Sequence, residues 1–285
     1  MYQSAHVAGR PDYDPRSEML RGSQRNGGAA GIALRSSERA ARLMWGAKGL
    51  HDGLLLGALR PETVHRLDEL YFAGQDMYTD AGHNRAGLFW WERDAVERLF
   101  PAGGRVIVTA AGGGREVLAL REAGFDAIGF ECNDDLRETG CEQLVEAGHP
   151  PCLLPSPRDD FPEVDGRFDA GIVGWGGYMH IQGSEARVEF LRGFRDAVAE
   201  GAPVLVSFAI RSGNGPYHRA VAKVGTRLRR LRGLPGIELG DGLIPHYVHW
   251  FTRDELSREA ERAGFELAEW SGQDYGHAVL KARER

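Results

Sequence analysis

The sequence predicts an α/β protein with a doubly wound, mostly parallel seven-stranded sheet and an antiparallel last strand. Residues 105–131 have the pattern of a strand, a turn of small residues, a helix and a second strand, which is one β-loop-α-β unit. Apolar runs and amphipathic segments then alternate as far as residue 210, as a parallel sheet with right-handed crossovers requires. Two further apolar runs near the carboxyl end are separated by a glycine-rich turn and predict a hairpin.

Glycines end several of the helices beside this sheet, and capping residues begin two of them. The expected strands are 106–108, 127–130, 152–154, 168–173, 203–210, 265–270 and 277–282, and the expected helices are 115–123, 134–147, 185–199 and 252–264. Thr252 with Glu255 three residues later is a capping box, which marks where the last helix begins.

Segments outside this pattern are expected to add to the sheet. Residues 1–36, rich in Gly, Ser, Arg and Pro, predict a flexible arm, and residues 37–100 predict a helical cap. In that cap a helix over 37–59 is expected to be interrupted at Gly46, Gly49 and Gly53, and Tyr71, Tyr78, Trp90 and Trp91 are expected to be mainly packing residues, with a pocket role for one of them as the alternative. Residues 211–242 break the alternation and predict a lid at the carboxyl edge of the sheet, so that residues 101–285 form one domain with a lid insertion.

Composition limits the classes of partner. The 285 residues carry a net charge of −6, which gives no general attraction to nucleic acid or to an anionic membrane. No apolar run approaches the roughly 20 residues of a membrane span, and the first residues lack the apolar core of a signal peptide, so a cytoplasmic protein is expected. The three cysteines include no C-x-x-C pair, so they predict neither a disulfide framework nor a zinc site.

The turn of the central unit is built of side chains no larger than methyl, and it indicates a ligand. Ala110, Ala111, Gly112 and Gly114 would let a ligand lie against the backbone, and the helix behind them would offer free N–H groups. Glu131 follows Gly112 by 19 residues, at the tip of the next strand, where a carboxylate can accept hydrogen bonds from ribose hydroxyls. Val117 replaces the third glycine of a dinucleotide site, and an empty unit whose glycines only make a turn remains the alternative.

Several segments together resemble the class I S-adenosylmethionine-dependent methyltransferases. They are VIVTAAGGGRE, GFE at 129–131, RFDAGIVGWGGYMHI, VEFLRGFRDAVAEGAPVLVSF and HWFTRDELSREAERAGFELAEW, in that order. The resemblance implies a Rossmann-like methyltransferase domain over residues 101–285 and S-adenosylmethionine as cofactor. It implies cofactor-binding roles for Ala110, Ala111, Gly112, Gly114, Glu131, Cys132, Asp159, Gly174 and Trp175. The chain departs from the family at Val108, Ala110 and Pro157, which occupy places where the family often has an acid, a glycine and an acid.

A hydroxyl acceptor would need a general base, and histidine suits that role near neutral pH. His180 follows the fourth strand, and His246 and His249 follow the lid, so all three are expected at the carboxyl edge of the sheet. Tyr178 and Tyr247 are candidate substrate-binding residues. His246-x-x-His249 has a spacing that metals use, but with no third ligand evident no metal is expected. Deprotonation without a dedicated base remains the alternative.

The expected function is methyl transfer to an oxygen or nitrogen of a small molecule, either a specialised metabolite of natural-product biosynthesis or a modified peptide. The alternatives are an RNA or protein methyltransferase, indicated only by the arginines of residues 223–232, and a non-catalytic nucleotide-binding protein. Nucleic acid is the less favoured partner because of the acidic net charge, and the oligomeric state is not predicted.

Overall fold

The computed structural model describes residues 29–273 and 275–284. The chain divides into two compact units that interleave along the sequence. The larger unit comprises residues 65–210 and 251–285, and the smaller unit comprises the chain up to residue 64 together with residues 211–250. The domain boundaries expected from the sequence, at residues 36 and 100, differ from these divisions.

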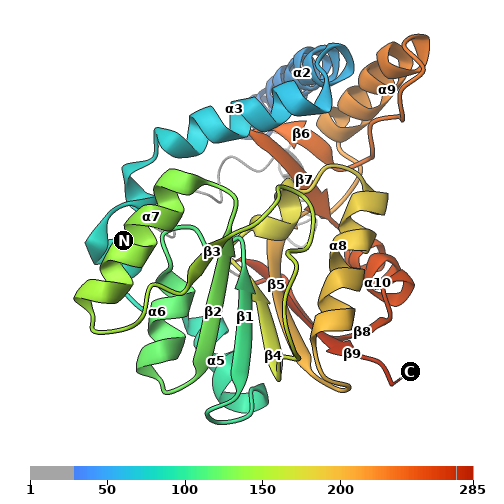
Figure 1. The fold of residues 1–285 in the computed structure, drawn as a ribbon. Helices are drawn as coiled ribbons and strands as arrows, with labels where there is room; N and C mark the ends of the chain where they lie inside the picture. The colour runs from blue at the N-terminus through green and yellow to red at the C-terminus, as the bar shows by residue number, and fades with distance from the viewer. Residues whose placement is uncertain (1–28, 274, 285) are drawn as a thin grey trace. The chain divides into compact units, whose positions relative to one another are not determined.

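The larger unit contains the predicted seven-stranded sheet (Figure 1). Its strands are β1 (Arg105–Thr109), β2 (Asp126–Glu131), β3 (Leu153–Pro155), β4 (Ala170–Val173), β5 (Pro203–Ile210), β8 (Phe265–Ser271) and β9 (Gly276–Ala282). The order across the sheet is β3-β2-β1-β4-β5-β9-β8; the first five strands are parallel, and β9 pairs antiparallel with both β5 and β8. The predicted mostly parallel sheet with an antiparallel last strand is therefore confirmed.

Helices cover both faces of this sheet. One face holds α5 (Trp90–Leu99), α6 (Arg115–Glu122) and α7 (Asp134–Glu146), and the other holds α8 (Ser184–Ala197) and α10 (Arg253–Arg262). Successive residues of β1 divide between the two cores: Val106 and Val108 pack with α5 and α6, whereas Ile107 packs with α8. This alternation follows from the period of two in a strand, and burial on both faces explains why β1 is apolar throughout its centre.

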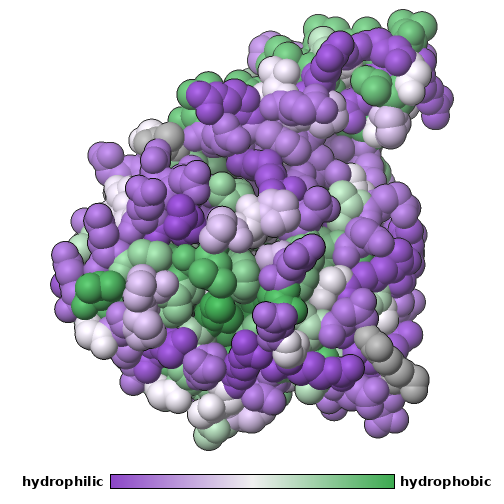
Figure 2. Space-filling view, in the orientation of Figure 1, coloured by the Kyte–Doolittle hydropathy of each residue, from purple (hydrophilic) through white to green (hydrophobic). Residues whose placement is uncertain are grey.

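The crossover from β3 to β4 has no helix, as the sequence predicts. Residues 156–169 form an irregular connection with only short bends. Leu154 of β3 is 41% exposed, and hydrophobic residues gather on the visible surface over β1 and β2 (Figure 2). The connection thus leaves part of this sheet face uncovered by a helix, and it brings polar residues of the loop to the carboxyl ends of the strands.

Short elements around the carboxyl ends of the strands complete the larger unit. They are α3 (Pro61–Ala73), of which residues from His65 onward belong to this unit, η1 (Asp76–Tyr78), α4 (Ala81–Asn84) and η2 (Gly177–His180). Asp80 begins α4 by accepting a hydrogen bond from the backbone N–H of His83 at 2.7 Å.

The smaller unit contains a pair of helices and a hairpin. Helix α2 (Ala29–Ala58) packs along α9 (Pro216–Leu231), and β6 (Asp241–Leu243) pairs antiparallel with β7 (Tyr247–Phe251). The prediction of an interrupted helix is wrong, because α2 is continuous through all three glycines. Residues 1–28 of the expected arm lie outside the described residues, and residues 29–36 are helical.

The predicted lid segment contains α9 and β6, and the β6–β7 hairpin is not anticipated by the sequence pattern. No helix among the described residues is long and apolar enough to cross a membrane.

Candidate cofactor-binding site

A pocket in the larger unit lies where β1, β2 and β4 end. Its wall includes Thr109, Ala110 and Gly112 at and after the end of β1, Glu131, Cys132 and Asn133 at and after the end of β2, and Trp175, Gly177 and His180 after β4. The loop after β3 adds Arg158, Asp159 and Asp160, and α3 and η1 add Phe72 and Tyr78. Carboxyl ends of adjacent parallel strands are where α/β sheets bind ligands, so the fold brings the predicted turn and the predicted acid into one cavity.

The backbone of the turn after β1 has the conformation that small residues permit. Ala110 and Gly112 have positive φ angles of 49° and 52°. A Cβ atom built on Gly112 would meet no other atom within 4 Å, so this glycine borders open space in the pocket. A Cβ on Gly113, in contrast, would lie 2.2 Å from the backbone oxygen of Tyr78, so that glycine serves packing. Close approach of a ligand is therefore possible at Gly112 in particular.

Glu131 occupies the position that the sequence predicts for a ribose-binding carboxylate. Its side chain is buried at 6% exposure and still lines the pocket. Oε2 accepts a hydrogen bond from the backbone N–H of Gly112 at 2.7 Å, and Oε1 accepts one from Asn133 at 2.8 Å. The Cys132 thiol also lies 3.5 Å from Oε1. The two backbone bonds fix the carboxylate between the β1 and β2 loops, and Oε2, with one donor, can accept a further hydrogen bond from a hydroxyl.

The residues around the pocket fit a nucleoside ligand. Thr109 is 2% exposed, and its Oγ1 has no hydrogen-bond partner among the described residues, although the side chain borders the pocket. A buried polar atom of this kind costs free energy unless a ligand or water satisfies it. Together with the open space over Gly112 and the carboxylate of Glu131, Thr109 gives the pocket polar groups suited to a sugar and its substituents.

Trp175 lines the pocket just beyond the end of β4. The ring centroid lies 5.1 Å from that of Phe89, nearly perpendicular to it, and 5.6 Å from that of Tyr275. The backbone N–H of Trp175 donates to Glu116 at 3.2 Å. Gly174 precedes it, and a Cβ atom there would lie 2.2 Å from the carbonyl oxygen of Ala110, so this glycine lets β4 end close against the β1 turn.

A buried ion cluster lies directly behind the turn, and the sequence analysis missed it. Arg115 donates to both carboxylate oxygens of Glu92 at 2.7 Å and to Glu116 at 2.7 Å, and its guanidinium lies 3.9 Å from the centre of the Phe89 ring. All three ionisable side chains are less than 5% exposed. Burial, together with the neighbouring Glu116 carboxylate, raises the pKa of Glu92 to about 7, although the hydrogen bonds and charge of Arg115 act in the opposite direction. The only trace of this cluster in the sequence is the Arg-Glu pair at the first two positions of α6. Charged residues at the start of a helix are ordinarily solvated, so the pair does not indicate a buried cluster.

The loop after β3 enters the pocket through Asp159, which has a φ angle of 63°. Its Oδ2 lies 2.9 Å from Nε2 of His65 on α3, so the carboxylate joins the loop to that helix. Burial of the thiol and the neighbouring Glu131 carboxylate raise the pKa of Cys132 to about 12, which keeps the thiol neutral. Both residues line the pocket, and the neutral thiol of Cys132 is a poor nucleophile there.

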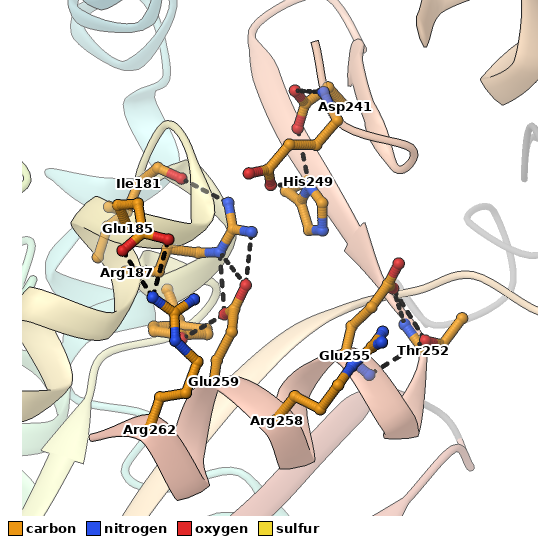
Figure 3. Close-up of polar contacts among 12 residues, drawn as sticks. Ile181, Glu185, Arg187, Asp241, His249, Thr252, Glu255, Arg258, Glu259 and Arg262 are labelled. Atoms are coloured by element: carbon orange, nitrogen blue, oxygen red, sulfur yellow. Dashed lines mark hydrogen bonds and ion pairs between the residues drawn. The ribbon is translucent and has the colours of Figure 1, made fainter. Parts of the chain in front are cut away.

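His180 and Tyr178 lie on the same short helix but have different surroundings. His180 borders the pocket, and its ring lies 5.4 Å from the ring of Phe72. Tyr178 is fully buried, and its hydroxyl donates to Glu259 of α10 at 2.7 Å. Figure 3 shows Glu259 also meeting Arg187 of α8, with a separation of 2.7 Å from Nη2 to Oε1. Tyr178 thus anchors η2 in the core, while His180 faces the cavity.

The other candidate residues of the acceptor side belong to the smaller unit. Tyr247 and His249 both donate to Oδ1 of Asp241 at 2.7 Å, and Figure 3 shows Asp241 beside His249. Glu238, Asp241 and His249 are the one group among the described residues that could hold a metal ion, with candidate ligand atoms within 4.8 Å of one another. His246 is not part of it, so the predicted His-x-x-His spacing does not build this group. The expected absence of a metal stays a prediction.

The structure thus brings together six of the predicted cofactor residues in one pocket. These six are Ala110, Gly112, Glu131, Cys132, Asp159 and Trp175. Ala111, Gly114 and Gly174 lie behind the wall, where they shape the β1 turn and its contact with β4. Phe72, Tyr78 and Thr109 line the pocket without having been predicted as site residues, except that a pocket role for Tyr78 stood as the alternative. For Phe72 and Tyr78, the signal available in the sequence was the presence of aromatic residues in the segment before the first strand.

Comparison with known proteins identifies the architecture. No protein-family model and no curated protein matches the sequence. An S-adenosylmethionine-dependent methyltransferase from Methanosarcina mazei is similar in structure, with a TM-score of 0.54 and 13% identity over 70% of this chain and 100% of the other. One from Clostridium acetobutylicum has a TM-score of 0.52 and 10% identity, over 78% of this chain and 98% of the other.

A third similar structure is the CcbJ methyltransferase from Streptomyces caelestis, with a TM-score of 0.50, 16% identity and coverage of 75% of this chain and 92% of the other. This chain has the fold of class I S-adenosylmethionine-dependent methyltransferases. In the methyltransferase fold of this chain, the glycine turn after β1 and the acid at the end of β2 border one pocket.

Proposed function

We propose that this protein is an S-adenosylmethionine-dependent methyltransferase that methylates an oxygen or nitrogen of a small molecule. The observation that carries the proposal is the buried carboxylate of Glu131, fixed by two backbone N–H groups at the edge of the pocket. The methyltransferase fold of the structurally similar proteins supports the same conclusion. A specialised metabolite is the acceptor class that we favour, since the pocket wall combines aromatic rings with a few polar groups.

The residues of the pocket divide into those that would hold the cofactor and those that would face the acceptor. S-adenosylmethionine supplies an electrophilic methyl group on a sulfonium when it is bound. Glu131 would accept hydrogen bonds from the ribose hydroxyls, Gly112 would allow the ligand close to the backbone, and Cys132 and Asp159 would border the adenine. Trp175 would lie beside the methionine part, and its ring would exclude water from the reacting groups.

On the acceptor side, His180 is the proton acceptor that we propose for a hydroxyl substrate. It borders the same pocket as Glu131 and Trp175. Tyr78 is unsuited to that role, because burial and the neighbouring Tyr71 and Glu116 raise its pKa to about 12. Tyr78 would therefore stay protonated and orient the acceptor through a hydrogen bond, while His180 takes the proton.

The cofactor proposal is tested by titration calorimetry of the full chain with S-adenosylmethionine. We expect the wild type to bind and Glu131→Gln to bind at least about tenfold more weakly, through loss of charge-assisted hydrogen bonds. Glu122→Gln, which changes an exposed glutamate of α6, is the matched control and should bind as the wild type does. Equal affinity of Glu131→Gln and wild type would show that the ribose site lies elsewhere.

The contrasting variant is His180→Gln, assayed with a panel of phenols and amines by the formation of S-adenosylhomocysteine. Cofactor affinity should stay within about twofold of wild type, whereas methylation of phenols should fall about a hundredfold. An unchanged rate with a phenol acceptor would remove His180 from the mechanism.

A further inference from the structure

Helix α2 carries a line of large apolar side chains on its exposed side. Ile32, Leu43, Leu50 and Leu54 are exposed by 61%, 75%, 51% and 52%. At about 100° per residue, these four positions fall within about 40° of one another around the helix axis, over roughly 33 Å of its length. Hydrophobic residues are visible on the surface over this helix in Figure 2. Single exposed leucines are ordinary, but a continuous line of them indicates a binding surface.

Small residues alternate with the large ones along this line. Ala40, Ala47 and Ala58 are exposed and lie on the same side of the helix. The positions Ala40, Leu43, Ala47, Leu50 and Leu54 follow spacings of three, four, three and four, which is the heptad pattern of a two-helix seam. We call the set Ile32, Ala40, Leu43, Ala47, Leu50, Leu54 and Ala58 the α2 seam.

The α2 seam is separate from the side of the helix that packs within the smaller unit. That packing side is formed by Gly49, Gly53 and Gly57, where added Cβ atoms would meet Tyr217, Val221 and Leu228 of α9 at 3.0 Å or less. The partner of the glycine side is therefore α9, and α9 does not cover the leucines.

We propose that the α2 seam binds the α2 seam of a second copy of this chain, with the two helices antiparallel. Antiparallel pairing places Leu43 opposite Leu54 of the second copy and Ala47 opposite Leu50, so that a small residue faces a large one at the centre. Alternation of small and large residues allows two helices to approach closely and interlock. The seam is thus complementary to itself under a two-fold axis.

The charges along α2 favour the antiparallel direction. Arg35, Arg39 and Arg42 all lie in the amino-terminal half, and the carboxyl-terminal residues 53–58, Gly-Leu-Leu-Leu-Gly-Ala, carry no charge. A parallel pair would stack Arg39 beside its own counterpart, whereas the antiparallel register sets Arg39 and Arg42 against residues 58 and 55 of the uncharged stretch. Like charges in contact are destabilising, so the direction follows from the sequence of the helix itself.

An anionic membrane is the competing occupant, because the smaller unit is basic. Residues 29–64 and 211–250 hold twelve Lys and Arg against five Asp and Glu. However, the cations Arg219, Lys223 and Arg227 lie on α9, outside the α2 seam. Membrane-surface helices use bulky apolar residues without need of alternating alanines. The heptad alternation therefore favours a second helix over a lipid surface.

The proposal is tested by light-scattering mass measurement of the full chain during size-exclusion chromatography. We expect the wild type to have twice the chain mass of 31.3 kDa, and Leu43→Glu and Leu50→Glu to have the mass of one chain. Val145→Glu is the matched control, since Val145 is 57% exposed on α7 in the other unit, and it should remain dimeric. Far-UV circular dichroism checks that the variants remain folded.

Cysteine pairing tests the direction and does not depend on the folding of the glutamate variants. A chain carrying Leu43→Cys is mixed with one carrying Leu54→Cys under mild oxidation, with the wild type as control for its own cysteines. We expect a disulfide-linked dimer in the mixture and little in Leu43→Cys alone. A wild type that stays monomeric at every attainable concentration overturns the proposal. So does a monomer that sediments with vesicles of equal parts phosphatidylcholine and phosphatidylglycerol.

Discussion

The cluster of Arg115, Glu92 and Glu116 shows how single buried side chains position the pocket. Arg115 joins α5 to α6 through Glu92, and Glu116 accepts from the backbone of Trp175. Removing one partner of a buried ion pair leaves an uncompensated charge, which is more costly than the pair is stabilising. The cluster therefore fixes the position of the β1 turn relative to the β4 loop, and both of these segments border the pocket.

Glu92 also predicts a pH dependence of stability. Its folded pKa of about 7 lies above the ordinary value of 4.5, so the folded state binds a proton more tightly than the unfolded state. The contribution of this tighter proton binding to the stability of the folded state is complete below about pH 4.5, and it is lost as the pH rises to about 7. We expect the free energy of unfolding of the wild type to fall by about 1 to 3 kcal/mol over that pH range, relative to that of Glu92→Gln.

The control for this comparison is Glu97→Gln, an exposed change on the same helix, which should follow the wild-type pH profile. If the difference between wild type and Glu92→Gln is constant from pH 4.5 to pH 7.5, Glu92 does not titrate there. Urea unfolding curves in matched buffers measure all three free energies.

At residue scale, the sequence predicts the parts of the pocket that have a fixed place relative to a strand end. Gly112 and Glu131 are of this kind, since Gly112 lies in the turn after β1 and Glu131 ends β2 of the β-loop-α-β unit. Phe72 and Arg115 are not predictable in this way, because their place in the site depends on contacts across elements. Thr109 does end a strand, but a threonine is ordinary at such a position and gives no sign of a site.

At element scale, the glycines of α2 illustrate a conflict between local propensity and packing. Glycine inside a helix costs up to about 1 kcal/mol relative to alanine, which is why the sequence predicts interruptions. The structure has one helix of 30 residues, because Gly49 lies so close to α9 that a Cβ atom would be 2.6 Å from the backbone oxygen of Tyr217. Close helix packing outweighs the propensity, and that packing involves residues more than 150 positions away.

This conflict gives a paired prediction. Gly49→Ala should destabilise the protein by about 1 to 3 kcal/mol, because the methyl group forces α2 away from α9. Gly46→Ala should instead stabilise it by about 0.5 to 1 kcal/mol, since a Cβ atom there would meet nothing within 4 Å. Thermal and urea unfolding followed by circular dichroism distinguish the two. Destabilisation by both variants would mean that the geometry of α2 itself, and not its contact with α9, requires glycine at these positions.

At the scale of the whole molecule, the division into units differs from the order of the sequence. The sequence predicts consecutive blocks, because composition and periodicity change near residues 36 and 100. The compact units interleave instead: residues 211–250 join the amino-terminal helix, and the chain then returns to the sheet at β8 and β9. A helix pair formed across such a distance leaves no local signal, whereas the sheet is predictable because β1, β2 and β4 are each followed along the chain by a helix that packs on it.

The last prediction concerns how far the effect of cofactor binding extends. Every residue that lines the pocket belongs to the larger unit. Hydrogen exchange of the full chain with S-adenosylhomocysteine should therefore slow at amides of residues 110–116 and 131–136, and stay unchanged in α2 and α9. Glu131→Gln at the same ligand concentration should show less protection, since occupancy falls. Protection confined to α2 and α9 would place the ligand in the smaller unit and remove the basis for the Glu131 site.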